Sequence, residues 1–196
     1  TGVGLSGDGE FRQTAGHHMR GLNLFVARDA TATGDYTLAG GSITVGGTSF
    51  IGRSGNGTFT QTAGVHTTPD LVLGNVAGAK GVYDLQGGLL NVTGVATEMI
   101  GDAGTGSMNQ SGGTHDVVGN LILGNQITGT GLYTFTGGSL AVGGTTIVGN
   151  AGYGSFFQNG GTTSFTNNVV IGNQSTSTGN YELSSGITFG GTDTVW

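Results

Sequence analysis

The sequence contains no cysteine, one proline and few charged residues. Without cysteine there is neither a disulfide framework nor a metal site built from thiolates. Charged residues make up 8% of the chain, and lysine and arginine together number five. Because binding to nucleic acid requires a basic stripe that neutralises phosphates, we predict no nucleic-acid partner.

Long apolar segments are also absent. No run of about 18 apolar residues occurs, so we predict no membrane span. The chain begins at Thr1 with neither a basic region nor an apolar segment after it. We therefore expect that a signal peptide has been removed or was never included.

Glycine is what the sequence has in excess, with 44 residues among 196. Collagen would need a glycine at every third position and far more proline. A disordered chain would be poorer in apolar residues, which make up 35% of this sequence and recur at regular intervals. The composition and the intervals together indicate a repeat protein.

One column of large apolar side chains and two columns of glycine define the repeat. The large side chains are Phe11, Tyr36, Phe59, Tyr83, Met108, Tyr133, Phe156 and Tyr181, spaced by 23 to 25 residues. A glycine stands two residues before each of them, and another stands five residues after each. Units of two kinds alternate. We therefore assign one domain, residues 1–196, with four double units at about residues 7–54, 55–103, 104–151 and 152–196.

Within each unit the apolar residues alternate over short runs, as in Tyr133 and Phe135 or Leu121 and Leu123. A period of two indicates strands, and the glycine-rich segments between the runs suit sharp corners. We predict an all-β, right-handed parallel β-solenoid (β-helix) of about eight coils, each of ~24 residues with roughly three short strands. A β-sandwich or an up-and-down barrel is the alternative, but neither requires a fixed register of this length.

Residues 55–64 (GNGTFTQTAG), 71–74 (LVLG) and 81–88 (GVYDLQGG) resemble the repeats of bacterial autotransporter passengers. They are equally similar to the repeats of PEP-CTERM-type exported proteins. The resemblance covers essentially the whole chain. It implies a bacterial, exported protein that is extracellular or bound to the cell surface, with an adhesive or structural role.

The two ends of the chain stand at the same phase of the repeat. Val3 lies eight residues before Phe11, and residues 190–195 align with residues 46–51, which matches Val195 to Ile51. Solenoids usually end in polar capping units, yet neither end has a helix, a proline or a charge cluster suited to that role. We expect either continuation of a longer solenoid or head-to-tail stacking of copies, a homopolymer.

Three residues at the ends are the candidate end-to-end assembly contacts, namely Val3, Val195 and Trp196. Trp196 stands where earlier units have a glycine, such as Gly52 and Gly101. The two interpretations of Trp196 are ordinary divergence in the last turn and an aromatic plug between subunits.

Polar residues occupy two regular columns. The first is Gln13, Gln61, Gln110 and Gln158, and the second is His18, His66 and His115, followed by Thr163. Successive histidines should lie two coils apart, about 9.6 Å, which is too far for two of them to share a zinc ion. We predict no metal site and a structural role for both columns, with the side chains hydrogen-bonded in or beside the core.

The eleven carboxylates are dispersed along the chain. Polysaccharide lyases and hydrolases with a β-helix gather two or more acids on one face, as acid–base chemistry requires. We predict no catalytic residue, no cofactor and no enzymatic activity. Four asparagines, Asn75, Asn125, Asn150 and Asn173, follow a glycine at the end of a strand, and we expect them in left-handed turns.

Three hypotheses for the function remain. The first is a non-catalytic structural protein, a building block of a filament, sheath or surface layer assembled by coil stacking. The second is an adhesin-like module that binds glycans or a host surface, for which an exposed aromatic row would be the distinguishing feature. The third, which the scattered acids disfavour, is a polysaccharide-degrading enzyme.

Overall fold

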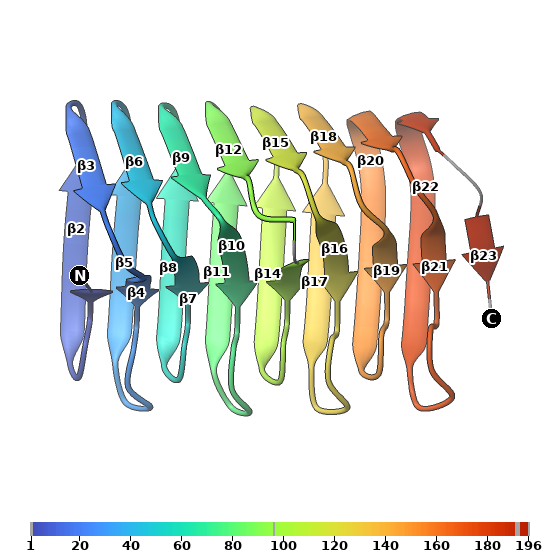
Figure 1. Ribbon diagram of the computed structural model, residues 1–196, viewed down its shortest axis with the longest axis horizontal. Helices are drawn as coiled ribbons and strands as arrows, with labels where there is room; N and C mark the ends of the chain where they lie inside the picture. The colour runs from blue at the N-terminus through green and yellow to red at the C-terminus, as the bar shows by residue number, and fades with distance from the viewer. Residues whose placement is uncertain (1, 96, 191–192, 196) are drawn as a thin grey trace.

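The computed structural model describes residues 2–95, 97–190 and 193–195, with the backbone alone for residues 187, 189 and 193–195. These residues form a right-handed parallel β-solenoid with three faces and no helix, which confirms the fold class (Figure 1). The rod has its N-terminal coil at one end and its C-terminal coil at the other. No helix in these ranges could cross a membrane.

The first face carries one strand of each coil. These strands are β2 (Asp8–Gln13), β5 (Thr33–Leu38), β8 (Asn56–Gln61), β11 (Lys80–Leu85), β14 (Thr105–Gln110), β17 (Thr130–Phe135) and the first halves of β20 (Tyr153–Phe165) and β22 (Thr178–Phe189). Each pairs in parallel with its neighbours in the adjacent coils, without a register shift from Asp8 to Gln158.

The second face follows after a glycine-rich corner. Its strands are β3 (His17–Arg20), β6 (Ser42–Val45), β9 (Val65–Thr68), β12 (Leu89–Val92), β15 (Thr114–Val117), β18 (Ser139–Val142) and the second halves of β20 and β22. The sequence predicts two separate short strands for the first two faces of every coil. In the last two coils one long strand instead runs through the corner, because β20 and β22 stay paired across it through register shifts beside Asn159.

The third face completes each coil. Its strands are β1 (Gly2–Val3), β4 (Leu24–Val26), β7 (Thr48–Ile51), β10 (Asp70–Leu73), β13 (Thr97–Ile100), β16 (Asn120–Leu123), β19 (Thr146–Val148), β21 (Val169–Ile171) and β23 (Asp193–Val195). We number the coils 1 to 8, with coil 1 formed by β2, β3 and β4 and coil 8 by β22 and β23. Strand β1 precedes coil 1 on the third face and pairs with β4.

Glycine is required where the chain turns off the third face. Gly74, Gly124, Gly149 and Gly172 have φ between 65° and 79°, and a side chain at the first three would meet the backbone at the start of a first-face strand, at Thr105, Tyr153 and Thr178. The expectation that the following asparagines adopt left-handed turns is wrong, because the preceding glycine supplies the positive φ. Ala27 is the one non-glycine residue with positive φ in the described chain, and it stands in this same glycine column.

The four asparagines instead form a hydrogen-bonded ladder along one corner of the rod. Asn75 and Asn125 donate to the two carboxylate oxygens of Asp102, at 3.0 and 2.8 Å. Asn150 then donates to Asn125 at 2.9 Å, and Asn173 donates to Asn150 at 2.7 Å. The ladder runs from coil 3 to coil 7, so it helps to hold the axial register of these five coils.

The core is a narrow stack of inward columns shared by all three faces. The column of large side chains points inward, and its rings stack along the axis with centroids 4.6 Å apart for Tyr36–Phe59 and 4.9 Å apart for Phe156–Tyr181. Leu24, Leu71, Leu121 and Leu123 of the third face are fully buried against this stack. Stacked apolar columns and continuous parallel pairing hold the rod together.

Candidate functional site

The polar columns predicted from the sequence lie inside the rod. Their side chains form lines of hydrogen-bonded groups that run across the section of the rod, and each line begins at a glutamine of an odd coil. Nε2 of Gln61 donates to the carbonyl oxygens of Gly64, at 3.1 Å, and Leu89, at 3.0 Å. Gln13 and Gln110 bind two backbone carbonyls in the same way. Because the amide nitrogen is held by two acceptors, Oε1 of each glutamine must accept a hydrogen bond.

A tyrosine of the following coil supplies that hydrogen bond. Tyr36 donates to Gln13 at 2.8 Å, Tyr83 to Gln61 at 2.6 Å, and Tyr133 to Gln110 at 2.6 Å. Nδ1 of the histidine in the same odd coil then lies against the tyrosine oxygen, at 3.1 Å for His18, 3.0 Å for His66 and 2.9 Å for His115. Since the tyrosine proton is already used, Nδ1 carries the imidazole proton and donates it.

The other ring nitrogen, Nε2, has a different partner in each coil. Nε of Arg20 donates to His18 at 2.7 Å, in the open first coil. The hydroxyl of Ser49 lies 3.1 Å from Nε2 of His66, and a carboxylate oxygen of Glu98 lies 2.9 Å from Nε2 of His115. Ser49 and Glu98 come from the third face of the preceding even coil, so each line crosses the whole section of the rod.

Burial determines the protonation state of the hydrogen-bonded line that contains His66. The pKa of His66 falls to about 3, first because the ring is fully removed from water and second because His115 repels its charge. The pKa of Tyr83 is raised well above its ordinary range, mainly by burial and then by Glu98. At neutral pH the Ser49–His66–Tyr83–Gln61 line is therefore uncharged.

The Glu98–His115 pair differs because it shares a proton. With Nδ1 of His115 donating to Tyr133, a bare lone pair facing a bare carboxylate at 2.9 Å would be repulsive, so one proton lies between Nε2 and Oε2. The pair carries no net charge whichever atom holds that proton. Oε1 of Glu98 is buried and has no hydrogen-bond partner, which leaves this line less well satisfied than the one around His66.

These lines have the distances of catalytic dyads without the access that catalysis requires. Ser49, Glu98, His66 and His115 are all 0% exposed. A nucleophile or a general acid must touch its substrate, and no substrate can reach these atoms while the coils are stacked. The arrangement ties neighbouring coils together by hydrogen bonds.

Coil 7 carries a different set of residues at the same positions. Thr163 stands where coils 3 and 5 have histidine, and Phe165 stands where they have Thr68 and Val117. Phe165 packs edge-on against Phe156, with ring centroids 6.2 Å apart. Thr146, which corresponds to Ser49 and Glu98, has a buried hydroxyl without a hydrogen-bond partner.

Sequence reasoning identified the glutamine and histidine columns but missed Ser49, Glu98 and the tyrosine hydroxyls. A signal was present, since Ser49 and Glu98 each stand 17 residues before the histidine that they contact. Of the candidate end contacts, Val3 lies in β1 and is nearly buried. The side chain of Val195 and the whole of Trp196 lie outside the described residues.

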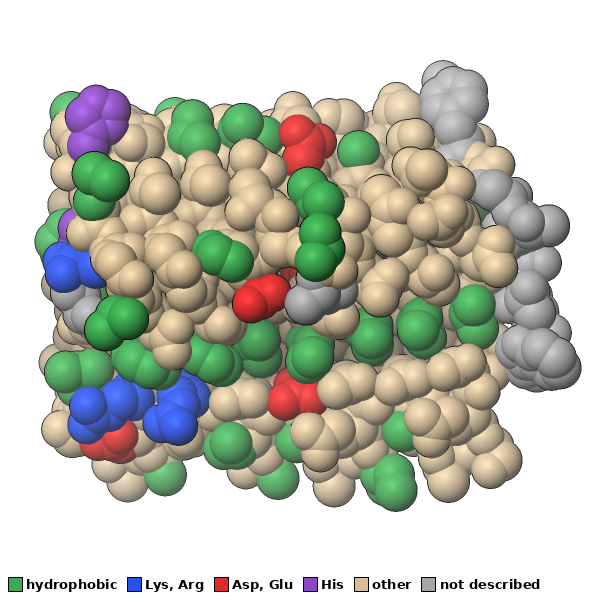
Figure 2. Space-filling view, viewed as in Figure 1, with side chains coloured by type: hydrophobic (Ala, Val, Ile, Leu, Met, Phe, Trp, Pro, Cys, Tyr) green, Lys and Arg blue, Asp and Glu red, His purple; other side chains and the backbone are tan. Residues whose placement is uncertain are grey.

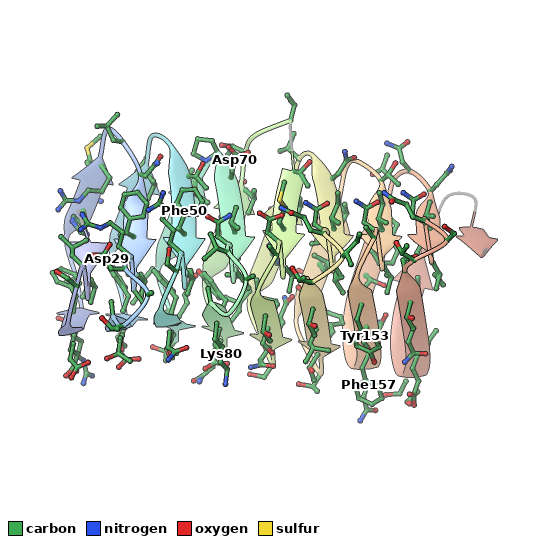
Figure 3. The ribbon with its side chains drawn as sticks, turned by 90° about the horizontal axis from the view of Figure 1, so that it is seen from below. Asp29, Phe50, Asp70, Lys80, Tyr153 and Phe157 are labelled. Carbon is green, nitrogen blue, oxygen red and sulfur yellow. The ribbon has the colours of Figure 1, made fainter. Side chains whose placement is uncertain are left out.

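Histidine and carboxylate side chains are the candidate metal ligands among the described residues. In the part of the chain that the structure describes, no three histidine or carboxylate side chains come close enough to share an ion. A shallow depression on the first face is lined by Asp8, Glu10 and Asp35 at the N-terminal end of the rod. Further along this face, Lys80, Tyr153 and Phe157 point away from the rod (Figure 3).

The third face carries a stripe of outward apolar side chains. The register places Phe25, Phe50, Val72, Met99, Ile122, Ile147 and Val170 side by side in successive strands. Figure 2 shows a row of hydrophobic side chains running along the rod, with lysine and arginine side chains gathered toward the N-terminal end and acidic side chains also near the middle. Phe25 and Phe50 stack with centroids 5.5 Å apart, and the Arg53 guanidinium lies 5.5 Å from the Phe25 ring.

Comparison of the chain with protein-family models, curated proteins and solved structures gives no match.

Proposed function

We propose that this chain is a non-catalytic structural protein, a rigid rod that extends by stacking its end coils on other copies to build an extracellular filament, sheath or surface layer. The observation that carries the proposal is the state of the two end coils. Phe11 is 39% exposed, whereas Phe59 and Phe156 of the same column are fully buried. At the other end Leu183 is 51% exposed, whereas Leu38 and Leu85 are fully buried.

The backbone at these ends supports the same proposal. Strands β2 and β3 each pair with a single neighbour on the sheet, as does β22 at the opposite end. An open parallel edge together with exposed core side chains is a surface on which further strands can pair. The polar lines inside the rod serve this role because they fix the register of each coil on the next.

Electron microscopy of native material that has never been refolded tests the proposal. We expect unbranched filaments with an axial repeat on the order of 38 Å, eight strand spacings of ~4.8 Å each. Leu183→Asp should prevent assembly, because it places a charge in an inward column at the junction. Ile127→Asp is the matched control, since Ile127 is 73% exposed on a corner at mid-rod and its variant should assemble normally.

Single rods of eight coils at every concentration would contradict this proposal and favour the second candidate, a module that binds glycans or host surfaces through a lateral face. The apolar stripe of the third face, with its stacked Phe25 and Phe50, is the observation that favours it. Phe50→Ser should then abolish retention on a glycan or cell-surface preparation, while the variant remains a folded single rod.

A further inference from the structure

Coil 1 is an odd coil and coil 8 is an even coil, and the two kinds differ in their inward residues. This difference determines which kind of contact two stacked copies would make. Odd coils carry phenylalanine or methionine in the large column and glutamine two residues later, whereas even coils carry tyrosine and then leucine or phenylalanine. Coil 8 is even and coil 1 is odd. A copy stacked on coil 8 therefore makes the same kind of contact that coils 2, 4 and 6 make with coils 3, 5 and 7.

The inward columns show what such a contact looks like. At the even-to-odd steps inside the rod, tyrosine stacks on phenylalanine with centroids 4.6 Å apart for Tyr36–Phe59 and 4.8 Å apart for Tyr133–Phe156. At a junction the same column brings Tyr181 onto Phe11 of the next copy. It also brings Leu183 onto Gln13, as Leu85 lies against Gln110 inside the rod.

The outward columns of the first face are chemically complementary across the ends. Coil 1 presents Asp8, Glu10 and Arg12, and coil 8 presents Thr178, Asn180 and Glu182 in the same three columns. Inside the rod such neighbours bind each other: Thr33 donates to Asp8 between coils 1 and 2, and Asn109 donates to Asp84 at 2.7 Å. Two acids thus meet a hydroxyl and an amide, and Arg12 meets Glu182.

The second and third faces add a further match. Arg20 points into an inward column, and the corresponding residue of coil 8 is Gly190, which follows Phe189 in the register and leaves room for a long side chain. The backbone of Asp193 pairs in register with Val169, which continues the third-face column of Ser49, Glu98 and Thr146.

We propose that coil 8 of one copy stacks on coil 1 of the next in this even-to-odd register, with Glu182 paired to Arg12. This inference rests on the proposed stacking function and specifies its partner and contacts. Arg12 and Glu182 are the outward pair of opposite charge, and the other two outward columns of the first face pair an acid with a neutral polar group.

Strand β1 must give way in this junction. Gly2 and Val3 pair with Phe25 and Val26 at the place on β4 that β23 of the preceding copy would occupy. β1 has two residues, whereas β23 has three. The longer strand replaces the shorter one, so β1 covers the edge of the third face until a partner arrives.

Charge reversal tests the register. Arg12→Glu and Glu182→Arg should each reduce junction affinity roughly tenfold, since an attractive cross-strand pair becomes a repulsive one. The sharper result concerns an equimolar mixture of the two variants: every junction in an alternating copolymer again pairs opposite charges, so the mixture should assemble like wild type. Thr60→Arg, in the same outward column at coil 3, is the control and should assemble normally.

The outcomes separate this inference from the function on which it rests. If wild-type filaments form but both reversed variants assemble alone as well as wild type, the register is wrong and the stacking function stands. If wild type forms no filaments, both are overturned. Val3→Asp should loosen β1 and lower the concentration at which filaments form by several-fold, and an unchanged or raised concentration would show that β1 is not displaced.

Discussion

Coils 3 and 5 fill the centre of the rod with a buried histidine, whereas coil 7 fills it with Thr163 and Phe165. In the first two, the ring is stacked in the core and hydrogen-bonded at both nitrogens. In coil 7 a phenylalanine occupies the space, and the hydroxyl of Thr146 has no hydrogen-bond partner. The same backbone therefore accepts either a buried histidine or a threonine together with a phenylalanine.

The comparison also ranks the two histidine lines. His66 meets the neutral hydroxyl of Ser49, and Ser49 has a further partner in Thr68 at 3.0 Å. His115 meets Glu98, which has no other hydrogen-bond partner for Oε2 and none at all for Oε1. A buried carboxyl is tolerated at Glu98 because a histidine faces it, and this dependence can be tested directly.

The largest effect is expected where a carboxylate enters the core without such a partner. Leu123→Asp places a charge in a fully buried position of the third face, beside Ile100 and Val148. We expect a loss of about 5 kcal/mol or more in the free energy of unfolding, spread over adjacent coils. Thermal unfolding followed by circular dichroism measures it, and a cooperative melt close to that of wild type would contradict the core assignment.

Removing the partner of Glu98 should cost slightly less. His115→Leu leaves the Glu98 carboxyl buried and unpaired, and we expect a loss of about 4 kcal/mol. The matched change in coil 3, His66→Leu, should cost about 1 kcal/mol, because Ser49 retains Thr68 and Tyr83 retains Gln61.

Leucine suits the histidine position sterically, as Leu90 and Leu140 occupy it in even coils. The double variant Glu98→Leu with His115→Leu should therefore recover most of the loss, giving a large coupling energy in a double-mutant cycle. Equal losses for His115→Leu and His66→Leu would show that the two lines do not differ in this way.

Lowering the pH should reduce the stability of the rod through His66. The pKa of His66 is about 3 in the folded rod and about 6.5 unfolded, so between these values the unfolded chain binds the additional proton. This contribution to stability is present above pH 6.5 and is lost as the pH falls toward 3. The loss between pH 7 and pH 4 amounts to about 3 kcal/mol from this residue.

Denaturant unfolding of wild type and His66→Leu at both pH values isolates that contribution from the titration of surface carboxylates. The gap between wild type and variant should shift in favour of the variant on acidification. If the gap is the same at pH 7 and pH 4, the ring of His66 is not held neutral in the folded state.

The fold could be predicted from the sequence because every coil repeats the same pattern of residues. A large side chain with glycine at fixed offsets recurs eight times, so strands, corners and parallel stacking follow from one unit. The glutamine and histidine columns followed from the same register. The partners of Nε2 of each histidine could not be predicted in this way, because Ser49 and Glu98 lie on a different face and in a different coil from the histidines that they contact.

The sequence predicted stacking at the two ends, but it did not predict the charged residues there, for a related reason. Along the chain, Asp8, Glu10, Arg12 and Arg20 look like scattered charges, and they seemed to offer neither a cap nor a contact. The fold collects them on one terminal coil, where their columns can be compared with those of coil 8. Charged residues that are far apart in the sequence become neighbours on the rod, so their pattern can be recognised only when the strand register is known.

The smallest expected effect comes from converting coil 7 to the composition of coil 5. Thr163→His together with Phe165→Val would place a ring nitrogen within reach of the Thr146 hydroxyl, by analogy with His66 and Ser49. Satisfying a buried hydroxyl while conserving total volume should raise the free energy of unfolding by about 1 kcal/mol.

Thr163→His alone should instead lower stability by about 2 kcal/mol, because Phe165 already occupies the space that the imidazole needs. Chemical denaturation of the single and double variants distinguishes a matched set from independent positions. If the double variant were no more stable than Thr163→His alone, the residue at position 165 would not determine whether a histidine fits at position 163. The joint variation of positions 163 and 165 would then carry no structural meaning.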